Sequence, residues 1–383
     1  MRRLIAIIAS LVVATSGAAT VAPAVEDAAI AGQYVVYWPD GRVGDIPAID
    51  GVTVLETPDE LAALGVSVVS VDGLPALAAL RRSGARADRR DSLEAGPGVN
   101  TPYSAISAPL AAIDPLLADQ WHHARVDSAG AWRAGFTGVG VRVAVVDTGI
   151  APHADLSILA GKDFTGSGTW VDQNGHGTHV AGIIGARYAN GRGGSGIAPG
   201  VDLLAARALG ADGIGYNDWI AAGIVWSVNN GARVVNLSLG SPDPSVVLER
   251  ALAYAVAHGA IPVCAAGNDG SSRLDYPSAY PDCLSVAASN LRDEMAPWSN
   301  HARTVDITAP GVGILSTCYG LRGEYCYMDG TSMAAPVVSG VAALVAQSVR
   351  NPAGVSWRIR SRADIRPALP GGRRVNAARA VAR

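Results

Sequence analysis

Residues 141–149 read Val-Arg-Val-Ala-Val-Val-Asp-Thr-Gly, and this stretch decides the fold class. It is an almost uninterrupted apolar run that ends in a carboxylate and a glycine. A strand that is apolar on both faces is typical of a parallel sheet covered by helices on both sides. The glycine after Asp147 and Thr148 lets the backbone turn away where the strand ends, and ligands of open parallel sheets bind at that edge. We therefore expect Asp147 to lie at a functional edge of a buried sheet.

The same pattern recurs along the chain. Further apolar runs, predicted to be buried strands, cover residues 201–206, 232–239, 260–266 and 284–288. Segments with helical character lie between them, at 179–188, 218–229 and 245–258. This alternation predicts an α/β fold, with a three-layer α/β/α domain around a mostly parallel sheet over residues 111–383.

The N-terminal residues have a different character. Arg2 and Arg3 precede the apolar run 4–13, and small residues follow as far as Ala24, which predicts a signal peptide over residues 1–24. An uncleaved membrane anchor is the alternative, although the apolar run is short for a bilayer span. No later apolar run is long enough to cross a membrane. We expect a secreted, extracellular product without a stable membrane anchor.

A small α+β unit with its linker is predicted over residues 25–110. Two β-like runs, 33–37 and 66–71, and a helical run, 74–82, form its core. Residues 83–108 follow and are rich in Gly, Ser, Asp, Pro and Arg, which is typical of a loose, protease-sensitive linker. An ordinary surface loop within one continuous domain is the alternative.

Composition excludes several classes of protein. Hydrophobic residues make up 49% of the chain and charged residues 16%, which is incompatible with wholesale disorder. The net charge of -3 is too small to steer nucleic acid or an anionic membrane. Nucleic acid is therefore not an expected partner.

Four cysteines in an exported chain favour two disulfides over a metal site. Cys318 and Cys326 flank a glycine-containing segment that can close a hairpin. Cys264 and Cys283 lie in separate strand-like runs and form the remaining local pair. Three connectivities are formally possible, and reduced buried thiols are the alternative to disulfides.

A second motif, residues 172–182, reads Asp-Gln-Asn-Gly-His-Gly-Thr-His-Val-Ala-Gly. It places His176 at the start of a helix, where an imidazole can face a cleft and act as a general base. His179, one turn later, is expected in the core. A metal site at these two histidines is disfavoured, because the glutamate of H-E-x-x-H is absent and no third ligand is near.

A third motif, residues 330–336, reads Gly-Thr-Ser-Met-Ala-Ala-Pro and precedes the apolar run 337–345. Ser332 is thus predicted to begin a buried helix. The positive end of the helix dipole would stabilise an oxyanion there, and a nearby base could activate the hydroxyl. A simple helix cap is the alternative reading of a lone serine.

Other catalytic classes do not match these motifs. An aspartic peptidase would need a second Asp-Thr-Gly or Asp-Ser-Gly, which the chain lacks. Residues 191–196 match G-x-G-x-x-G, but they follow a helix and precede a strand, the reverse of the dinucleotide-binding context. Residues 236–240 lack the first glycine of the lipase-type G-x-S-x-G.

In this order, the Asp-Thr-Gly, His-Gly-Thr-His-Val-Ala-Gly and Gly-Thr-Ser-Met-Ala-Ala-Pro motifs resemble the subtilisin-like serine peptidases. The resemblance covers roughly residues 115–383. It implies a secreted serine endopeptidase in which Asp147 orients His176, His176 acts as general base and then acid, and Ser332 attacks the scissile carbonyl. A catalytically silent relative that acts as a binding or regulatory protein is the alternative.

The resemblance also implies how a polypeptide substrate binds. Asn268, in the run Ala265-Ala266-Gly267-Asn268, would donate its amide to the oxyanion. The substrate would lie as an extra strand between two backbone segments, and its side chain before the cut would lie between two further stretches. The residues concerned are Gly213 and Gly215 on one segment, Ser238, Leu239 and Gly240 on the other, and Ala265 and Gly267 in the pocket wall.

One acidic residue departs from the pattern of the family's broad-specificity members. Relatives tend to have a small or neutral residue at the position of Asp275, and we hypothesise that Asp275, together with Asp269, favours basic or polar side chains.

Catalysis in this family needs no cofactor, although a structural calcium is common. Asp155 aligns with a recurrent ligand of that ion, but its partner loop, 190–196, has few oxygen side chains, which leaves the site in doubt. By analogy with the family, the unit over residues 25–110 is predicted to be a propeptide that inhibits the enzyme until autoprocessing removes it. We expect the chain to act as a monomer.

Overall fold

The computed structural model describes residues 32–37, 46, 48–50, 52–55, 59–71, 76, 79–80, 86–89, 92–95, 114–320 and 323–382. The predicted signal peptide, residues 1–24, and most of the predicted helix 74–82 lie outside these residues. Within the described part of the chain, no helix combines the length and apolar character needed to cross a membrane.

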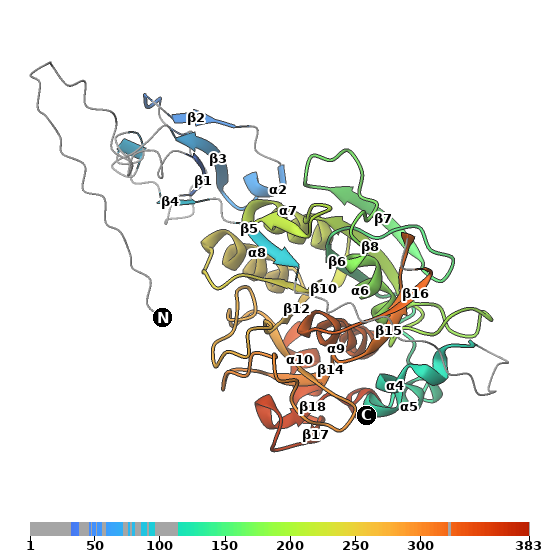
Figure 1. Ribbon diagram of the computed structural model, residues 1–383. Coiled ribbons are helices and arrows are strands. Elements are labelled where there is room, and N and C mark those ends of the chain that lie inside the picture. Colours follow the sequence, from blue (N-terminus) through green and yellow to red (C-terminus); the bar gives the residue numbers. More distant parts are fainter. Residues whose placement is uncertain are drawn as a thin grey trace, which may run out of the picture.

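A nine-stranded sheet organises the larger part of the molecule (Figure 1). Its strands are parallel except for the edge strand β17, which pairs antiparallel with β18. In spatial order they are β17 (Asp364–Ile365), β18 (Arg373–Arg374), β14 (Ile307–Pro310), β13 (Leu284–Ser289), β12 (Ile261–Ala265), β10 (Ala232–Leu237), β6 (Arg142–Asp147), β8 (Asp202–Arg207) and β7 (Ile158–Asp163).

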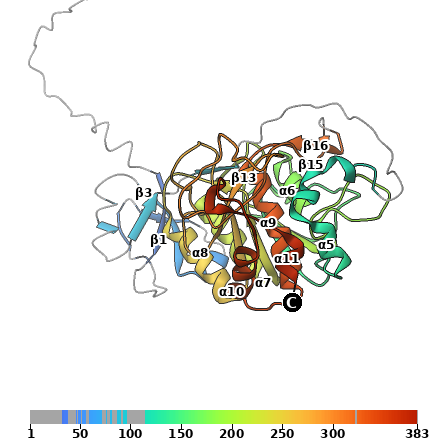
Figure 2. The same ribbon diagram turned by 90° about the horizontal axis from the view of Figure 1, so that it is seen from below.

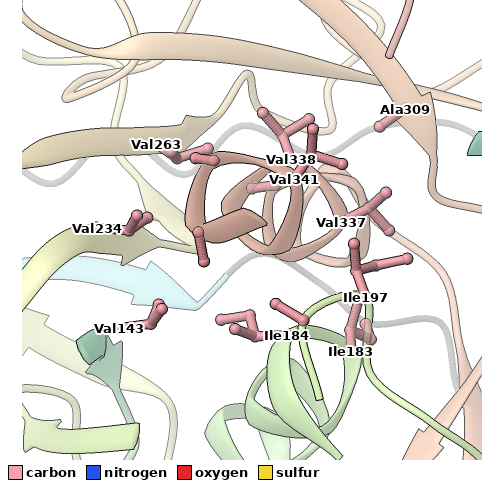
Figure 3. Packing of buried hydrophobic residues seen from close by; sticks show 14 of the residues in the cluster. Val143, Ile183, Ile184, Ile197, Val234, Val263, Ala309, Val337, Val338 and Val341 are labelled. Carbon is pink, nitrogen blue, oxygen red and sulfur yellow. The ribbon is translucent and has the colours of Figure 1, made fainter. Parts of the chain in front are cut away.

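Alternate side chains of the central strands enter two separate hydrophobic cores. In β6, Val143 and Val145 pack with α6 (His176–Gly185) and α9 (Thr331–Ala346). Ala144 and Val146 pack on the other face with α7 (Asn217–Asn229) and α8 (Val246–Ala257). Figure 3 shows the valines of α9 beside the strand residues Val234 and Val263, with Ile183 and Ile184 of α6 below them. The sheet is thus buried on both sides, and the predicted three-layer α/β/α class is confirmed.

The predicted elements differ from the observed ones mainly at their ends. The run 232–239 divides into β10 and β11 (Leu239–Gly240) at Ser238, whose hydroxyl bonds to Ser332. The helix predicted at 179–188 begins earlier, at His176, because the Gly175 φ of 103° ends the preceding turn there. The short or partly polar strands β7, β14, β17 and β18 were not predicted.

The remaining elements surround these layers. They are α4 (Trp121–Val126), α5 (Ser128–Arg133), α10 (Pro352–Ser361), α11 (Ala377–Val381), two 3-10 turns (Leu117–Asp119 and Pro370–Gly372), and the hairpin of β15 (Ile314–Thr317) and β16 (Tyr325–Met328).

A small four-stranded antiparallel sheet lies at one side of the molecule, next to α8 (Figure 2). It contains β1 (Gly32–Tyr37), β2 (Val52–Val54), β3 (Val66–Val71) and β4 (Arg86–Arg89), with the short helix α2 (Asp59–Ala62) beside it. The predicted runs 33–37 and 66–71 are therefore strands. Leu61, Val66 and Val68 share a hydrophobic cluster with α7 and α8, so the small sheet is packed on the larger domain.

Polar contacts add to this packing. Lys162 of β7 is paired with Glu60 of α2, and its ammonium lies 5.2 Å from the centre of the Phe164 ring. Arg250 of α8 lies over the Tyr37 ring at 4.4 Å and donates a hydrogen bond to Leu64 O. Lys162 is the single lysine of the chain.

The stretch 83–108, predicted to be a loose linker, contains two strands. Residues 86–89 form β4, and β5 (Ser92–Ala95) lies on the larger domain between β9 (Ile214–Tyr216) and β11. Both pairings of β5 are antiparallel. The prediction was wrong for these residues. Pairing with β1 orders β4, and pairing with β9 and β11 orders β5, although the composition of the segment alone favours a loop.

Two disulfides join the cysteines as predicted. Cys264 pairs with Cys283, and Cys318 pairs with Cys326, at Cα separations of 6.0 and 5.8 Å. The first links β12 to the segment before β13, and the second closes the β15–β16 hairpin. Both are local along the chain, as the spacing indicated.

Candidate active site

Asp147 is the last residue of β6, and its side chain is fully buried. Thr148 N donates to its Oδ1 at 2.7 Å. Gly149 has a φ of 103°, and a β-carbon there would lie 2.3 Å from Trp170 O, so only glycine permits this turn. The sharp turn leaves the carboxylate at the carboxyl edge of the sheet, as expected from the sequence.

His176 is the first residue of α6 and faces the Asp147 carboxylate. Its Nδ1 lies 2.8 Å from Asp147 Oδ1 and 3.0 Å from Oδ2. Since a carboxylate can only accept, Nδ1 carries the proton in this contact, and Nε2 is directed to the opposite side of the ring. A β-carbon on Gly177 would lie 2.1 Å from Gly149 O, so the residue after the histidine must also be small.

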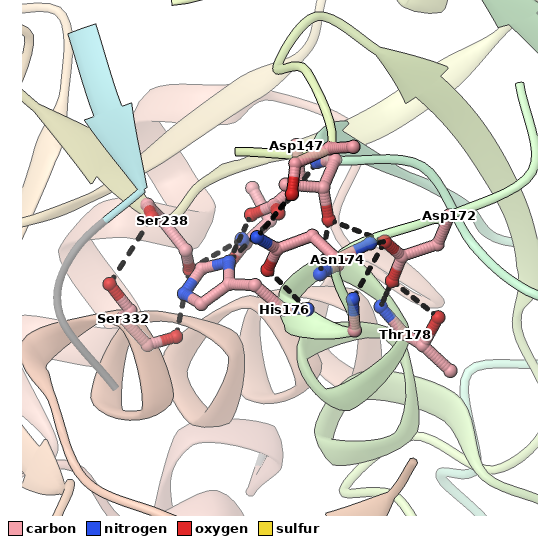
Figure 4. A network of polar contacts seen from close by, with 12 residues as sticks. Asp147, Asp172, Asn174, His176, Thr178, Ser238 and Ser332 are labelled. Carbon is pink, nitrogen blue, oxygen red and sulfur yellow. Dashed lines mark hydrogen bonds and ion pairs between the residues drawn. The ribbon is translucent and has the colours of Figure 1, made fainter. Parts of the chain in front are cut away.

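A buried network joins the turn after β6 to the start of α6, and sequence reasoning missed its role. Asp172 Oδ1 accepts from Thr148 Oγ1 (2.9 Å), and Oδ2 accepts from Thr178 N (2.9 Å) and Oγ1 (2.6 Å). Thr148 Oγ1 in turn accepts from Gly177 N at 2.9 Å. These bonds fix the relative position of Asp147 and His176 (Figure 4). Asp172 is part of the quoted motif, but nothing in its spacing identified it as an orienting residue.

Ser332 lies in the first turn of α9, directly after Thr331, and is fully buried. Its hydroxyl donates to Ser238 O at 3.2 Å, and Ser238 Oγ donates to Ser332 O at 2.8 Å. Figure 4 shows the Ser332 hydroxyl pointing toward the His176 ring, on the side away from Asp147. The structure therefore brings together Asp147, His176 and Ser332, which are far apart in the sequence.

Asn268 is held at the same edge by Thr331. Its Oδ1 accepts from Thr331 N at 2.9 Å and from Thr331 Oγ1 at 3.0 Å. Because the backbone N–H can only donate, these bonds identify the oxygen and direct the amide N–H₂ away from Thr331. The amide is thus preorganised next to the start of α9. The orienting role of Thr331 was not predicted.

The two segments expected to hold a substrate do pair with an extended strand. Gly215 pairs with Leu93 of β5, and Leu239 and Gly240 pair with Ala95 and Glu94. Gly213, with a φ of 82°, forms the turn before β9. The expected pocket walls at Ala265 and Gly267 are buried, and Asp275 lies beside Gly240 and Gly267.

Two protein side chains contact the carboxylate of Asp155, the expected calcium ligand. Asp155 Oδ1 accepts from Asn190 Nδ2 at 2.5 Å, and Oδ2 accepts from the Tyr325 hydroxyl at 3.3 Å. Burial raises the pKa of this carboxyl above its usual range, although these hydrogen bonds oppose the rise. Both carboxylate oxygens accept hydrogen bonds from protein donors, and calcium binding at Asp155, which would need six to eight oxygen ligands, stays a prediction.

Backbone N–H groups of the adjacent loop bind a second carboxylate, that of Asp114. The buried Asp114 carboxylate accepts from the backbone N–H groups of Ala189 (2.6 Å), Asn190 (3.0 Å) and Gly191 (3.2 Å). Ala189 and Gly191 have φ values of 61° and 74°, a backbone conformation that turns successive N–H groups inward to bind an anion. The Asp114 carboxylate occupies this anion-binding turn and thereby holds the N-terminal end of the larger domain against the loop 189–191.

We predict that Asp114→Ala lowers the free energy of unfolding by about 3 kcal/mol, because buried N–H groups lose their acceptor. Asp119→Ala, at a partly exposed position nearby, should have a much smaller effect. Thermal unfolding followed by circular dichroism would measure both variants. Equal melting temperatures for Asp114→Ala and Asp119→Ala would contradict this account.

The comparisons agree with this fold and define the class of protein, a hydrolase of the serine peptidase class. The family model described as Subtilase family matches residues 138–368, more than half of the chain. The protein therefore belongs to the subtilase family, and it is a serine endopeptidase of the subtilisin type.

Relatives are similar over stretches of comparable length. Subtilisin BL from Lederbergia lenta is 46% identical over 242 residues, which cover 63% of this chain and 88% of that protein. M-protease from Shouchella clausii is 45% identical over 242 residues, or 63% of this chain and 62% of that protein. The thermostable alkaline protease from Halalkalibacterium halodurans is 41% identical over 268 residues, covering 68% and 73% of the two chains.

Proposed function

We propose that the protein is a secreted endopeptidase that hydrolyses polypeptides through Asp147, His176 and Ser332 and is made as an inactive precursor. The observation that carries the proposal is the contact of His176 Nδ1 with Asp147, with the Ser332 hydroxyl on the other side of the ring. An imidazole held in this tautomer presents Nε2 as a base toward the serine.

The chemistry follows from this arrangement. Ser332 Oγ attacks the scissile carbonyl carbon while His176 Nε2 takes its proton, and the Asp147 carboxylate stabilises the imidazolium that forms. Asn268 donates to the resulting oxyanion, together with the positive end of the α9 dipole. His176 then returns the proton to the leaving amine as the C–N bond breaks. Water repeats the sequence on the acyl-enzyme and releases the acid.

The precursor would be inhibited by its own chain. β5 pairs with β9 and β11 as the middle strand of three, which is where an extended substrate would bind. The hydrophobic contacts of Leu61 and the Glu60–Lys162 pair hold the small sheet on the larger domain. They thereby raise the effective concentration of β5 in the cleft between β9 and β11. Cleavage of the linker and loss of this unit would open the site.

Labelling with a fluorophosphonate tests the proposed chemistry, because this reagent reacts with activated serines. The matured protein should be labelled at Ser332 and should cleave denatured casein, whereas Ser332→Ala should do neither. Ser227→Ala is a matched control, since Ser227 is buried in α7 and its hydroxyl donates to Gly223 O of its own helix. Correctly matured protein without labelling would favour the catalytically silent alternative.

Intact mass analysis of the matured protein should place its N-terminus between residues 96 and 114. β5 runs antiparallel to β11, so its carboxyl end at Ala95 is directed toward Ser238 and Ser332, and the first accessible bonds follow it. Asp114 is fastened to the 189–191 loop and should remain with the domain. An N-terminus upstream of Ser92 would contradict the inhibitory role of β5.

A further inference from the structure

The Asp275 side chain lies against the two backbone segments that line the cleft. A β-carbon on Gly267 would lie 2.2 Å from Asp275 Oδ2, and one on Gly240 would lie 3.0 Å from the Asp275 β-carbon. Asp275 N donates to Ala266 O at 3.1 Å, and the next residue, Tyr276, pairs with Ser241, which fixes the backbone on both sides. Only glycine at positions 240 and 267 leaves room for the carboxylate here.

Strand pairing indicates which substrate side chain faces Asp275. Directly opposite residues of an antiparallel pair project to the same face, and so do residues two apart in one strand. Gly240 pairs with Glu94, and the β-carbon direction of Gly240 leads to Asp275. In a substrate bound in this register, the residue opposite Gly240 and the residue two positions later therefore face Asp275.

The later of these two residues is the one next to the cleaved bond. In β5, Glu94 is opposite Gly240 and Ala95 is opposite Leu239, so the next residue of a strand in this register lies opposite Ser238. Ser238 O accepts the hydrogen bond of the Ser332 hydroxyl at 3.2 Å. The residue opposite Ser238 thus has its carbonyl nearest the attacking oxygen, and its side chain projects to the face that Asp275 occupies.

The Asp275 carboxylate lacks a compensating donor. Burial raises its pKa to about 6, and Asp269 adds to the rise, while only the charge of Arg273 opposes it. No hydrogen bond from the described residues contributes to this balance. Arg273 is exposed, so it leaves the anion poorly neutralised. A half-buried carboxylate of this kind is best satisfied by a ligand that brings both charge and N–H donors.

We propose that Asp275 makes this enzyme prefer arginine or lysine immediately before the cleaved bond. A guanidinium or ammonium entering between Gly240 and Gly267 meets the carboxylate that these two glycines leave uncovered. This substrate class rests on the proposed peptidase function, and the experiment separates the two.

Fluorogenic peptides that differ only in arginine or citrulline before the reporter test the preference, because citrulline keeps the shape of arginine without its charge. At pH 8 the unaltered enzyme should have a kcat/KM for arginine about 10- to 100-fold that for citrulline. Asp275→Asn should bring this ratio close to one. Asp282→Asn, which changes the net charge equally in the same segment, should preserve the ratio.

The unaltered enzyme supplies a second readout that needs no variant. Between pH 8 and pH 5 the Asp275 carboxyl takes up a proton, so the ratio should fall as the pH is lowered. The charged groups that act on it are Asp269 and Arg273. Taking the ratio cancels the pH dependence that both peptides share through His176. In Asp275→Asn the ratio should be flat over the same range.

The outcomes are distinct. A ratio near one for the unaltered enzyme at pH 8, or an unchanged ratio in Asp275→Asn, overturns the assignment of Asp275. Efficient cleavage of leucine peptides in that case leaves the peptidase function intact. Failure to cleave any peptide, together with the absence of fluorophosphonate labelling at Ser332, overturns both proposals.

Discussion

Ser332→Ala is expected to lower kcat by about 10⁶-fold, a magnitude established for members of this family. The same loss is expected for His176→Ala, and the double variant should be no worse than either. The reason is that the imidazole and the hydroxyl act as one unit: a base without a nucleophile, or a nucleophile without its base, contributes almost nothing. Single-turnover kinetics on a peptide ester would measure the three variants.

The surroundings of Ser332 make this test decisive. Ser332 is fully buried and bonded to Ser238, so alanine removes one oxygen without exposing the helix. Additive losses in the double variant would show that the two side chains act independently, and the proposed triad would then be wrong. Retention of the precursor at full length in Ser332→Ala would further indicate that the chain processes itself.

Asn268→Ala is expected to lower kcat by about 10²- to 10³-fold with little change in KM, again a magnitude known from this family. The amide is held by Thr331, and in the proposed mechanism it donates only when the carbonyl oxygen becomes an oxyanion, so the loss should fall on the transition state and not on substrate binding. Steady-state kinetics on one peptide substrate would separate kcat from KM.

Thr331→Val supplies a graded control for this prediction. It removes the hydroxyl bond to Asn268 Oδ1 but keeps the backbone bond from Thr331 N. Its loss in kcat should therefore be smaller than that of Asn268→Ala. Asn229→Ala, at the end of α7, should have no effect on either constant. An unchanged kcat in Asn268→Ala would remove the amide from the oxyanion site.

Much of the fold could be predicted from periodicity, because the central strands are buried on both faces. The run around Val143 and Val145 is apolar at every position except Arg142, and such runs have few alternatives to a parallel strand. The three motif residues could be placed at strand or helix ends for the same reason. Edge strands such as β7 carry polar residues on their open side, so their pattern does not differ from that of a loop.

The supporting side chains could not be predicted, because their roles depend on contacts between distant segments. Asp172 acts on Thr148 and Thr178 across a turn, and Thr331 acts on Asn268. Neither relation leaves a periodic signal. β5 was missed for a related reason: its order comes from the two strand edges that it joins and not from its own composition. The Asp114 contacts likewise depend on a loop whose backbone N–H groups turn inward.

The position of the single lysine has a practical consequence. Reagents that couple to amines have one side-chain target in this chain, Lys162, on the edge strand β7 and partnered by Glu60 of the small unit. Once that unit has left, immobilisation on an aldehyde or activated-ester support should attach the enzyme through this edge or through its terminal amine. The cleft between β9 and β11 should then remain accessible to large substrates, and the immobilised material should have few orientations on the support.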